Sequence, residues 1–459
     1  MINIQSDSRK IKPGDTFVAV KCEVNDGHKY IENAIVSGAS KIVAEHGNYS
    51  VPTIIVDDSR EYLNDYLKEN YNKYLDEMTL IGLTGTNGKT TTAYLLYQAL
   101  NKFGMKTAYI GTIGFYLDKK IESLPNTSVD ICDMYDLLIR AYDAGYKTVI
   151  IENSSHALFN GRVKTIRYDY ALFTNLTQDH LDFHKTMENY ALAKQKLFRM
   201  LKQNGKAIIN CDDSYKDYFL LPENNNITFG FSDSDYQVIS DHMDNQGTEF
   251  IYKHDGKEYV VKTKLLGDYN VYNSLGAVAT MIDMGFDPDR VNKVMNEITA
   301  PPGRIDTVNY KTNAIIIDYA HTPDAIENII NTTKKITQGN IYIVFGCTGD
   351  RDRTKRPIMT NIATKNAKYV IITSDDQHEE EFSQIVDDMT KDIEATNYEV
   401  IESRRIAINK AISMLNEHDT LLILGKGHEE FIIMKNNTRI PFNDKECVLE
   451  ILSNLEKSS

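Results

Sequence analysis

The sequence predicts an α/β protein of three domains: a small N-terminal α/β domain at residues 1–76, a central domain at 77–300 and a C-terminal domain at 301–459. Its 459 residues are 42% hydrophobic and 25% charged, which suffices for about two to four globular domains. Apolar runs alternate with amphipathic helical patterns along most of the chain, as in mostly parallel sheets covered by helices. The turn-forming "PPGRID" at 301–306 separates two such regions.

The N-terminal domain is predicted from short apolar runs separated by turns. "TFVAV" at 16–20 and "TIIV" at 53–56 have the length and β-branched composition of buried strands. The polar helical stretch "REYLNDYLKENYNKYLDEM" follows at 60–78. We therefore expect a small α/β domain that ends in a connecting helix.

The central domain begins with the apolar strand "TLIGLTG" at 79–85. "TAYIGTIGF", "YKTVIIEN", "YDYALFTN" and "GKAIINCD" follow, each beside an amphipathic segment. Around residues 227–264 the pattern changes to the alternation typical of half-buried strands. A doubly wound, mostly parallel sheet is the expected fold of this domain.

The C-terminal domain repeats one pattern, an apolar strand that ends in polar, glycine-rich residues. The repeats are "AIIIDYAHTP", "NIYIVFGCTGD", "AKYVIITSDD" and "DTLLILGKGHEE". This pattern predicts a Rossmann-like α/β domain whose functional loops lie at the carboxyl ends of its strands.

Composition excludes several classes of protein. The net charge of −14 argues against binding of nucleic acid. No apolar run reaches the roughly 18 residues of a membrane helix, and "MINIQSDSRK" lacks the apolar core of a signal peptide, so we expect a cytoplasmic protein without membrane insertion. The cysteines are scattered and never form a C-x-x-C pair, which predicts free, mostly buried thiols. They are Cys22, Cys132, Cys211, Cys347 and Cys447.

The most specific motif is "LIGLTGTNGKTTTAYLLYQAL" at 80–100, where a strand, a glycine-rich loop and a helix follow one another. Backbone N–H groups of such a P-loop bind phosphates, Lys89 reaches the β- and γ-phosphate oxygens, and Thr90 can bind Mg²⁺. Leu83 replaces the first glycine of the general pattern, and Gly85 supplies the turn two residues later. The alternative, a glycine-rich turn with an exposed lysine, is much less favoured in this context. A nucleoside triphosphate site is predicted.

A P-loop needs a magnesium partner, and Glu152 at the end of the apolar strand in "TVIIENSSHAL" is a candidate. Such an acid is about as often a loop or helix cap. His180 and Asp182, after the strand "YALFTN", favour a metal site because their loop should open at the same edge of the sheet. Lys194 does not fit, since an ammonium group repels Mg²⁺; from the residues alone it is a surface lysine on an amphipathic helix.

Long motifs of this chain resemble those of the Mur ligases, in the same order and spacing over nearly its whole length. They are "TGTNGKTTT", "IENSSHAL", "TNLTQDHLDFHKTMENYALAKQKLF", "PPGRID", "DYAHTPDAIE", "FGCTGDRDRTKRP" and "GKGHEE". The likeness is greatest to the members that add the third residue of the peptidoglycan stem peptide. It implies a monomeric enzyme that uses ATP to form an acyl phosphate on UDP-N-acetylmuramoyl-L-alanyl-D-glutamate, which the amine of a diamino acid then attacks.

The resemblance also implies roles for individual residues. It makes Lys194 a carbamate, which resolves the charge conflict, and it gives Lys89, Lys194 and His180 catalytic roles. Asp182 and His184 shape their loop. The implied Mg²⁺ ligands are Thr90, Glu152, His180 and carbamylated Lys194. The implied ATP site consists of Gly85, Thr86, Asn87, Gly88, Lys89, Thr90, Thr91, Asn273, Arg304, Asp318 and His321. The implied UDP-muramoyl-dipeptide site consists of Ser8, Arg9, Thr127, Ser128, Ser154 and Arg162.

Two departures from the family pattern carry expectations of their own. "NTSVD" at 126–130 lacks the family's proline, so we expect a less fixed loop.

The residues implied to bind the amino acid are Arg351, Asp376, His378, Gly425 and Glu429. Relatives that use meso-diaminopimelate have D-N-P-R at the end of this strand, and here Asp376 stands at the position of the asparagine and His378 at that of the arginine. The missing arginine and the acids at 375–381 favour L-lysine over meso-diaminopimelate.

Alternatives to these predictions stay open. The acids at 379–381 also suit the N-terminus of the following helix, and His378 can still attract a carboxylate when protonated. Folylpolyglutamate and cyanophycin synthetases share the P-loop style and the activated carboxylate. A nucleotide-binding regulator without ligase activity is a further alternative. The presence of Lys89, Glu152, His180 and Lys194 argues against it.

Overall fold

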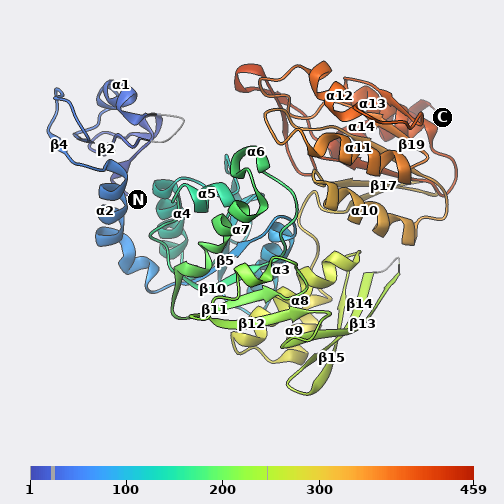
Figure 1. Cartoon of the computed structure of the whole chain (residues 1–459), viewed down its shortest axis with the longest axis horizontal. Helices are drawn as coiled ribbons and strands as arrows, with labels where there is room; N and C mark the ends of the chain where they lie inside the picture. The colour runs from blue at the N-terminus through green and yellow to red at the C-terminus, as the bar shows by residue number, and fades with distance from the viewer. Residues whose placement is uncertain (1, 22–25, 245–246, 459) are drawn as a thin grey trace. The chain divides into compact units, whose positions relative to one another are not determined.

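The computed structural model describes residues 2–21, 26–244 and 247–458. The chain divides into two compact units, which are described separately below (Figure 1). Unit 1 comprises Met1–Leu83, Phe103–Ala171 and Lys196–Lys206, and unit 2 comprises Thr84–Lys102, Leu172–Gln195 and Ala207–Ser459.

Unit 1 begins with a four-stranded parallel sheet in the order β1-β2-β3-β4. Its strands are β1 Ile4–Gln5, β2 Thr16–Val18, β3 Lys41–Ala44 and β4 Thr53–Ile55, with helix α1 at Ile31–Val36 and 3₁₀ segments at Ser8–Lys10 and Gly27–Tyr30. Phe17, Ile31 and Ile42 are fully buried between these elements, because strands this short are stable only with a shared apolar core. The predicted small α/β domain is present.

Helix α2 (Ser59–Leu75) is the predicted connecting helix. The side chain of Asp58 caps its start by accepting a hydrogen bond from the N–H of Glu61 at 2.9 Å. Leu63 and Leu67, four residues apart and therefore on one face, are buried.

The central sheet has eleven strands in the order β15-β14-β13-β12-β11-β10-β5-β9-β6-β7-β8. Its inner strands β5, β9 and β6 are parallel, whereas β7, β8, β14 and β15 pair antiparallel. The strands of the first half are β5 Thr79–Thr84, β6 Thr107–Gly111, β7 Gly114–Tyr116, β8 Lys120–Glu122, β9 Thr148–Glu152 and β10 Tyr168–Phe173. The second half consists of β11 Leu201–Asn210, β12 Asn225–Gly230, β13 Tyr236–Asp244, β14 Gly247–His254 and β15 Lys257–Thr263.

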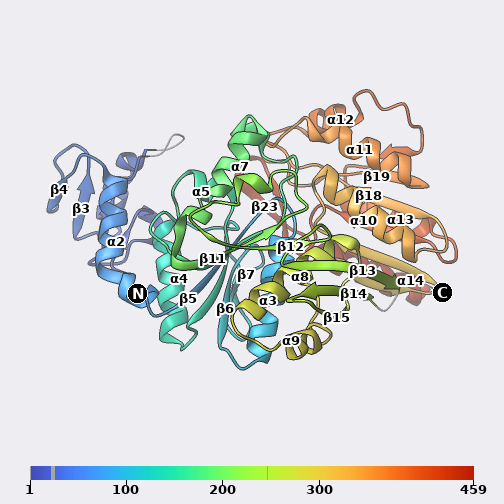
Figure 2. The same ribbon diagram turned by 60° about the horizontal axis from the view of Figure 1, so that its bottom comes forward.

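The helices of this region are α3 Lys89–Lys102, α4 Ile131–Asp143, α5 Ser155–Phe159, α6 Leu181–His184, α7 Met187–Gln195, α8 Asp268–Asp283 and α9 Pro288–Met295. In unit 2, α3, α8 and α9 pack against one another, as both views show (Figures 1 and 2). The N-terminus of α3 follows β5 directly, so it lies at the carboxyl end of a buried strand, where doubly wound sheets bind ligands.

The C-terminal part of unit 2 is a six-stranded sheet in the order β16-β17-β21-β18-β19-β20. All its pairs are parallel except that of β16 with β17. The strands are β16 Asp306–Tyr310, β17 Asn313–Asp318, β18 Ile341–Phe345, β19 Tyr369–Ile372, β20 Tyr398–Val400 and β21 Thr420–Leu424, followed by the hairpin β22 Phe431–Met434 and β23 Thr438–Pro441. The helices are α10 Pro323–Ile336, α11 Lys355–Asn366, α12 Phe382–Thr390, α13 Arg404–Met414 and α14 Asp444–Ser458.

Helices cover both faces of this sheet. On one face, Ile316 of β17 belongs to a buried cluster with residues of α10, α11 and α12. On the other, Ile315 and Ile317 belong to a cluster with residues of α13 and α14. Successive strand residues point to opposite faces, so this alternation confirms the predicted doubly wound, Rossmann-like domain.

Cys132, Cys211, Cys347 and Cys447 are free and buried, as predicted, and Cys22 lies outside the described residues. Among the described helices, none combines the length and the apolar character that crossing a membrane requires.

Candidate active site

The glycine-rich loop at 84–89 is hydrogen-bonded to residues 174–177. The N–H of Thr86 donates to the carbonyl of Asn175 at 2.8 Å, and the N–H of Asn87 donates to the side-chain oxygen of Asn175 at 2.9 Å. The hydroxyl of Thr174 donates to the carbonyl of Asn87 at 2.6 Å. These bonds stabilise one loop conformation, which is the preorganisation that phosphate binding by backbone N–H groups requires.

Two glycines of the loop are required by its geometry. Gly85 has φ +147°, and a Cβ there would lie 1.9 Å from the hydroxyl oxygen of Thr174. Gly88 has φ +84°, and its Cβ would lie 2.2 Å from the side-chain oxygen of Asn273. Asn273 is buried on α8, where it donates to Asn270 at 2.8 Å. Asn273 therefore packs directly against the loop.

Two lysines share one carbonyl oxygen of this loop. Lys89 Nζ donates to the carbonyls of Gly85 and Thr86 at 2.8 and 2.9 Å. Lys194 Nζ donates to the same Gly85 carbonyl at 2.6 Å. Thr90, the proposed Mg²⁺ ligand that follows Lys89, is buried at the start of α3.

Lys194 is buried, with 1% of its surface exposed, so the expectation of a surface lysine from the residues alone is wrong. Its Nζ lies 4.5 Å from the ring centroid of Tyr190. Burial, followed by the charge of Lys89, holds the pKa of Lys194 well below its ordinary value. The helical pattern of 187–195 could not reveal this, because the residues that bury Lys194 are distant in sequence.

The segment 177–184 contains a buried ion pair. Asp179 contacts Lys355 Nζ at 3.0 Å, and His180 and His321 lie 3.4 and 3.9 Å from its other oxygen. Burial alone would raise the pKa of Asp179, but Lys355 and the two histidines outweigh burial and hold it far below its usual range. The pairing of Asp179 with Lys355 was not predicted from the sequence, because neither motif indicates that the two residues meet.

The neighbours of Asp179 differ in exposure. His180 has left-handed backbone, with φ 55°, and its side chain is 31% exposed. His184 is buried with its ring centroid 5.0 Å from that of Tyr190, whereas Asp182 is exposed. His184 thus stabilises the loop, and His180 is the member of the motif that is open to a ligand.

Glu152 lies at the carboxyl end of β9 in unit 1 and is fully buried. The hydroxyl of Tyr109 and the N–H of Thr112 donate to one carboxylate oxygen, and the hydroxyl of Thr112 donates to the other at 3.0 Å. Hydroxyl donors of this kind orient a carboxylate and still leave lone pairs for a metal ion.

The predicted dipeptide-binding residues of the central region lie together in unit 1. The hydroxyl of Ser128 donates to the carbonyl of Glu152 at 2.9 Å and accepts from the N–H of Ser154 at the same distance. The hydroxyl of Thr127 contacts that of Thr112 at 3.1 Å, and Arg162 lies 3.2 Å from Asp130. Ser128 is buried, so its two hydrogen bonds anchor the loop at 126–130 without a proline.

Ser8 and Arg9 form a short 3₁₀ segment in the N-terminal sheet region. Asp7 caps this segment and accepts two hydrogen bonds from the Arg9 guanidinium at 2.9 and 2.7 Å. Ser8 is buried, whereas the side chain of Arg9 is 87% exposed, so Arg9 is the one accessible to a ligand.

Asp318 ends β17, and its carboxylate accepts hydrogen bonds from the N–H groups of Ile305 and Ala320, both at 2.8 Å. Burial raises the pKa of Asp318. Arg304 lies over the Tyr319 ring, 4.6 Å from its centroid, as in a cation–π contact. Burial and the charge of Lys355 lower the pKa of His321 to about 4, so its imidazole is neutral at pH 7.

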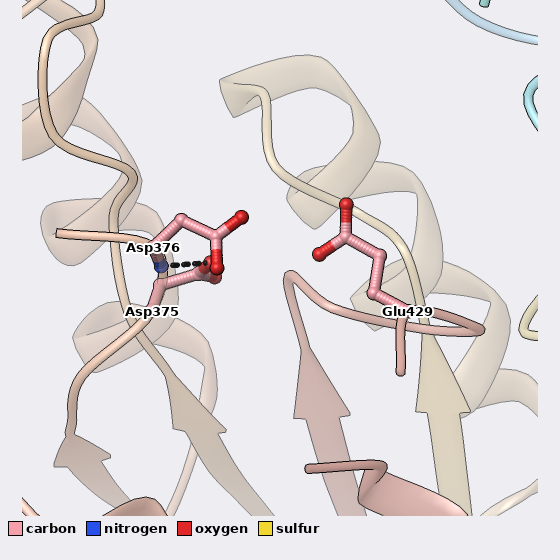
Figure 3. A group of neighbouring side chains, drawn as sticks. All are labelled: Asp375, Asp376 and Glu429. Atoms are coloured by element: carbon pink, nitrogen blue, oxygen red, sulfur yellow. Dashed lines mark hydrogen bonds between the residues drawn. The ribbon is translucent and has the colours of Figure 1, made fainter. Parts of the chain in front are cut away.

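The predicted amino-acid-binding residues follow three strands of the C-terminal sheet. Asp376 follows β19, Gly425 and Glu429 follow β21, and the exposed Arg351 follows β18. The carboxylates of Asp375 and Asp376 face that of Glu429 across the ends of these strands (Figure 3). His378 has left-handed backbone, with φ 49°, and its N–H donates to the carbonyl of Ile433 at 3.2 Å.

Three acids of this segment pair with cations, which was not foreseen. Asp376 contacts Lys426 Nζ at 2.8 Å. Glu380 pairs with Arg356 at 2.9 Å, and Glu381 pairs with Lys435. The negative field expected here, one of the two grounds for the preference for L-lysine, is therefore partly compensated.

Three sequence models of Mur ligases match the chain. They are the catalytic domain of the Mur ligase family at residues 2–78, the Mur ligase middle domain at 83–281 and the glutamate ligase domain of Mur ligases at 303–427. The chain belongs to the Mur ligase family and is an ATP-dependent, ADP-forming ligase.

Its relatives include a particular member of that family. The UDP-N-acetylmuramoyl-L-alanyl-D-glutamate--2,6-diaminopimelate ligase of Aquifex aeolicus is 40% identical over 452 residues, which cover 98% of this chain and 93% of the relative. A solved structure of a ligase with the same name has a TM-score of 0.68 at 30% identity, covering 99% of this chain and 95% of that one. The MurF ligase of Thermotoga maritima, solved in complex with ADP, has a TM-score of 0.71 at 20% identity over 100% and 98% of the two chains, and so shares the fold.

Proposed function

We propose that this ligase joins 2,6-diaminopimelate to UDP-N-acetylmuramoyl-L-alanyl-D-glutamate. The observation that carries the proposal is full-length similarity, at 40% identity, to a ligase named for this reaction. It outweighs our expectation of L-lysine, which rested on the missing arginine and on acidic side chains that Lys426, Arg356 and Lys435 partly compensate. L-lysine remains the second candidate, because His378 stands where the diaminopimelate motif described above has arginine.

The proposed reaction has two steps. A carboxylate oxygen of the D-glutamyl residue attacks the γ-phosphorus of ATP, giving an acyl phosphate and ADP. The neutral amine of the incoming amino acid then attacks the acyl carbon, giving the amide, inorganic phosphate and a proton. The role of this chain is to position the reactants and stabilise the charge on the transferring phosphoryl group, for which the loop N–H groups and Lys89 are suited.

We assign the ATP site to Gly85, Thr86, Asn87, Gly88, Lys89, Thr90, Thr91, Asn273, Arg304, Asp318 and His321. Their loop is preorganised by Thr174 and Asn175. Asp318 and His321 lie at the carboxyl end of β17, where such sheets bind ligands, and Arg304 lies over the ring of Tyr319 in the same segment. Thr90, Glu152, His180 and a carbamate on Lys194 would hold Mg²⁺, which offsets the charge of phosphate oxygens. Their hydroxyl, carboxylate and carbamate oxygens are donors that Mg²⁺ prefers, and Glu152 is already oriented by Tyr109 and Thr112.

A carbamate on Lys194 forms when its neutral amine attacks CO₂ and releases one proton. Two features support it: burial favours the neutral amine, and the ammonium group of Lys89, which shares the Gly85 carbonyl with Lys194, attracts the anionic product. The same surroundings that oppose a second ammonium group thus favour an anion.

The substrate sites are proposed from the same family pattern. Ser8, Arg9, Thr127, Ser128, Ser154 and Arg162 are assigned to the UDP-muramoyl-dipeptide. Arg351, Asp376, His378, Gly425 and Glu429 are assigned to the amino acid. An arginine suits its α-carboxylate, and Glu429 suits an ammonium group.

Organisation and location are proposed as well. We place the domain boundaries at 76/77 and 300/301, and we propose a monomer that works in the cytoplasm. The free, buried thiols of Cys132, Cys211, Cys347 and Cys447 suit a reducing compartment.

The test is phosphate release from ATP by the purified protein with UDP-N-acetylmuramoyl-L-alanyl-D-glutamate and either meso-diaminopimelate or L-lysine. We expect release that depends on both substrates, with a higher kcat/KM for meso-diaminopimelate. A clear preference for L-lysine would reverse the choice of amino acid. Release with a folate and glutamate, but with neither diamino acid, would reject the proposal.

A further inference from the structure

The proposed amino-acid site contains a buried cation that belongs to the chain itself. The Lys426 side chain is 0% exposed, and its Nζ lies 2.8 Å from Asp376, 2.7 Å from Glu429 and 3.8 Å from Asp375. The three carboxylates have oxygen atoms within 4.8 Å of one another, and they converge from two loops (Figure 3). Because Lys426 already neutralises part of this charge, we assign no metal ion to the group.

Lys426 joins segments that are separate in sequence. It lies two residues after β21. Its ammonium group donates hydrogen bonds to Asp376, in the loop after β19, and to Glu429 in its own loop. The N–H of Ile433 on β22 donates to the same oxygen of Asp376 at 2.8 Å. The position of the Glu429 carboxylate thus depends on Lys426, which is itself held by the loop after β19.

A second buried cation ties the ends of the same strands. Arg404, at the start of α13, donates to the carbonyls of Leu424 and Ser374 at 2.9 and 3.4 Å. It also pairs with both carboxylate oxygens of Asp444 at 2.7 Å. Arg404 is thus held by these partners, and among the described residues Lys426 is the cation paired with Glu429.

We propose that Lys426 is a positioning residue of the amino-acid site: it holds the Glu429 carboxylate and, in balance with Asp376, sets the pH range in which Glu429 binds an ammonium group of the incoming amino acid. The inference rests on the proposed function, because it takes Glu429 as an amino-acid ligand.

The electrostatic surroundings of Glu429 explain why this balance matters. Burial raises the pKa of Glu429 to about 7, Lys426 opposes that rise, and Asp375 and Asp376 add to it. The hydroxyl of Tyr319 lies 3.4 Å from the other Glu429 oxygen. The charged and titratable groups around Glu429 are Tyr319 after β17 with Arg304 over its ring, Asp375 and Asp376 after β19, Lys426 and His428 after β21, and Arg404 with Asp444 on α13 and α14.

The direction of each change follows from the charges. The ionised form of Glu429 binds an ammonium group, so kcat/KM for the amino acid rises as the pH rises through the pKa of Glu429. Lys426→Met removes a positive charge, which raises that pKa and moves the acidic limb of the profile to higher pH. Asp376→Asn removes a negative charge, which lowers the pKa and moves the limb to lower pH. Asparagine keeps an acceptor for Ile433 N–H.

The experiment measures kcat/KM for meso-diaminopimelate and for L-lysine against pH, at saturating ATP and UDP-muramoyl-dipeptide. We expect midpoints of the acidic limb that move by about one pH unit or more in opposite directions in the two variants. The midpoint of the double variant Lys426→Met/Asp376→Asn should fall between those of the two single variants. Because this variant removes two buried charges of opposite sign together, we expect it to fold even if Lys426→Met alone does not. Lys410→Met, an exposed lysine on α13 paired with Glu399, is the matched control and should keep the wild-type midpoint.

The outcomes separate the inference from the proposed function. If the midpoint of the double variant equals that of Asp376→Asn, whatever happens to kcat, then Lys426 has no effect on the titration of Glu429; Lys426 would be a purely structural residue and the inference would be overturned. If the wild-type protein adds neither diamino acid, the proposed function itself fails. If the acidic limb of the pH profile moves as expected while KM for ATP stays constant, both the inference and the proposed function are supported.

Discussion

At the scale of single residues, the chemistry of this protein depends on where charge is buried. Lys194 is enclosed, bonded to a loop carbonyl, and close to a second ammonium group on the same oxygen. A lysine in such surroundings is costly as a cation, because its charge is neither hydrated nor paired. Conversion to an anion replaces the repulsion by Lys89 with attraction, which gives the burial of Lys194 a chemical reason.

We predict that Lys194→Ala lowers kcat by at least about 100-fold, the usual scale for loss of an electrostatic group at a transition state. Addition of a short carboxylic acid should partly restore activity, because its carboxylate replaces that of the carbamate. Steady-state ADP formation measures both effects. Lys196→Ala, an exposed lysine two residues further on, should be unaffected. An active Lys194→Ala variant would contradict the carbamate.

The ion pair of Asp179 and Lys355 is the second consequence of buried charge. Both side chains are less than 10% exposed, so water screens their attraction little. Because the folded-state pKa of Asp179 lies below its unfolded value, its contribution to stability is present above the unfolded pKa and is lost as the pH falls through the folded pKa. At neutral pH the contribution is complete.

We therefore predict that Asp179→Asn destabilises the protein at pH 7 by about 3–5 kcal/mol, because it leaves Lys355 buried beside a neutral amide. Lys355→Met in the same chain should recover part of the loss, which a double-mutant cycle in urea measures. The pair of exposed Lys410 and half-buried Glu399 is the comparison, and Glu399→Gln should cost about 1 kcal/mol or less. Equal effects of the two carboxylate substitutions would show that burial does not matter here.

At the scale of elements, the phosphate loop shows what a motif predicts and what it leaves out. The glycines and Lys89 were predicted from the strand, loop and helix pattern alone. The partners that shape the loop were not predicted from this pattern: Thr174 and Asn175 follow β10, and Asn273, which the family resemblance assigned to ATP, lies on α8, so no local signal connects them to the loop. A sequence pattern reports backbone requirements, whereas packing partners depend on tertiary structure.

Gly88→Ala tests the steric part of this account. Alanine at φ +84° is strained, and its Cβ would lie 2.2 Å from the Asn273 side chain. We expect KM for ATP to rise by about tenfold or more while far-UV circular dichroism stays native. Adding Asn273→Ala removes the contact but not the strain, so it should restore ATP binding only in part. Unchanged ATP binding by Gly88→Ala alone would mean that the loop tolerates a side chain.

At the scale of the whole molecule, the alternation of strands and helices predicted the three α/β regions, because hydrophobic periodicity reflects which face of each element is buried. The preference for L-lysine is weakened for a different reason. It was inferred from the missing arginine and from the acids at 375–381 without their partners, and Lys426, Arg356 and Lys435 are too distant in sequence to be paired with these acids from a short segment. Charge in a site is a sum over the fold, so a short segment does not determine it.

The last prediction concerns the order of bond formation in the proposed reaction. Phosphoryl transfer to the substrate carboxylate makes the bridging oxygen of the acyl phosphate a carboxylate oxygen. Attack of the amine on carbon then expels phosphate with that oxygen attached, and the site needs only to stabilise charge. With both γ-carboxylate oxygens of the D-glutamyl residue labelled with ¹⁸O, we expect one label in inorganic phosphate and one in the new amide after each turnover, as measured by mass spectrometry. Unlabelled phosphate, with the second label released into water, would mean that the oxygen leaves without having been phosphorylated, and it would exclude the acyl phosphate.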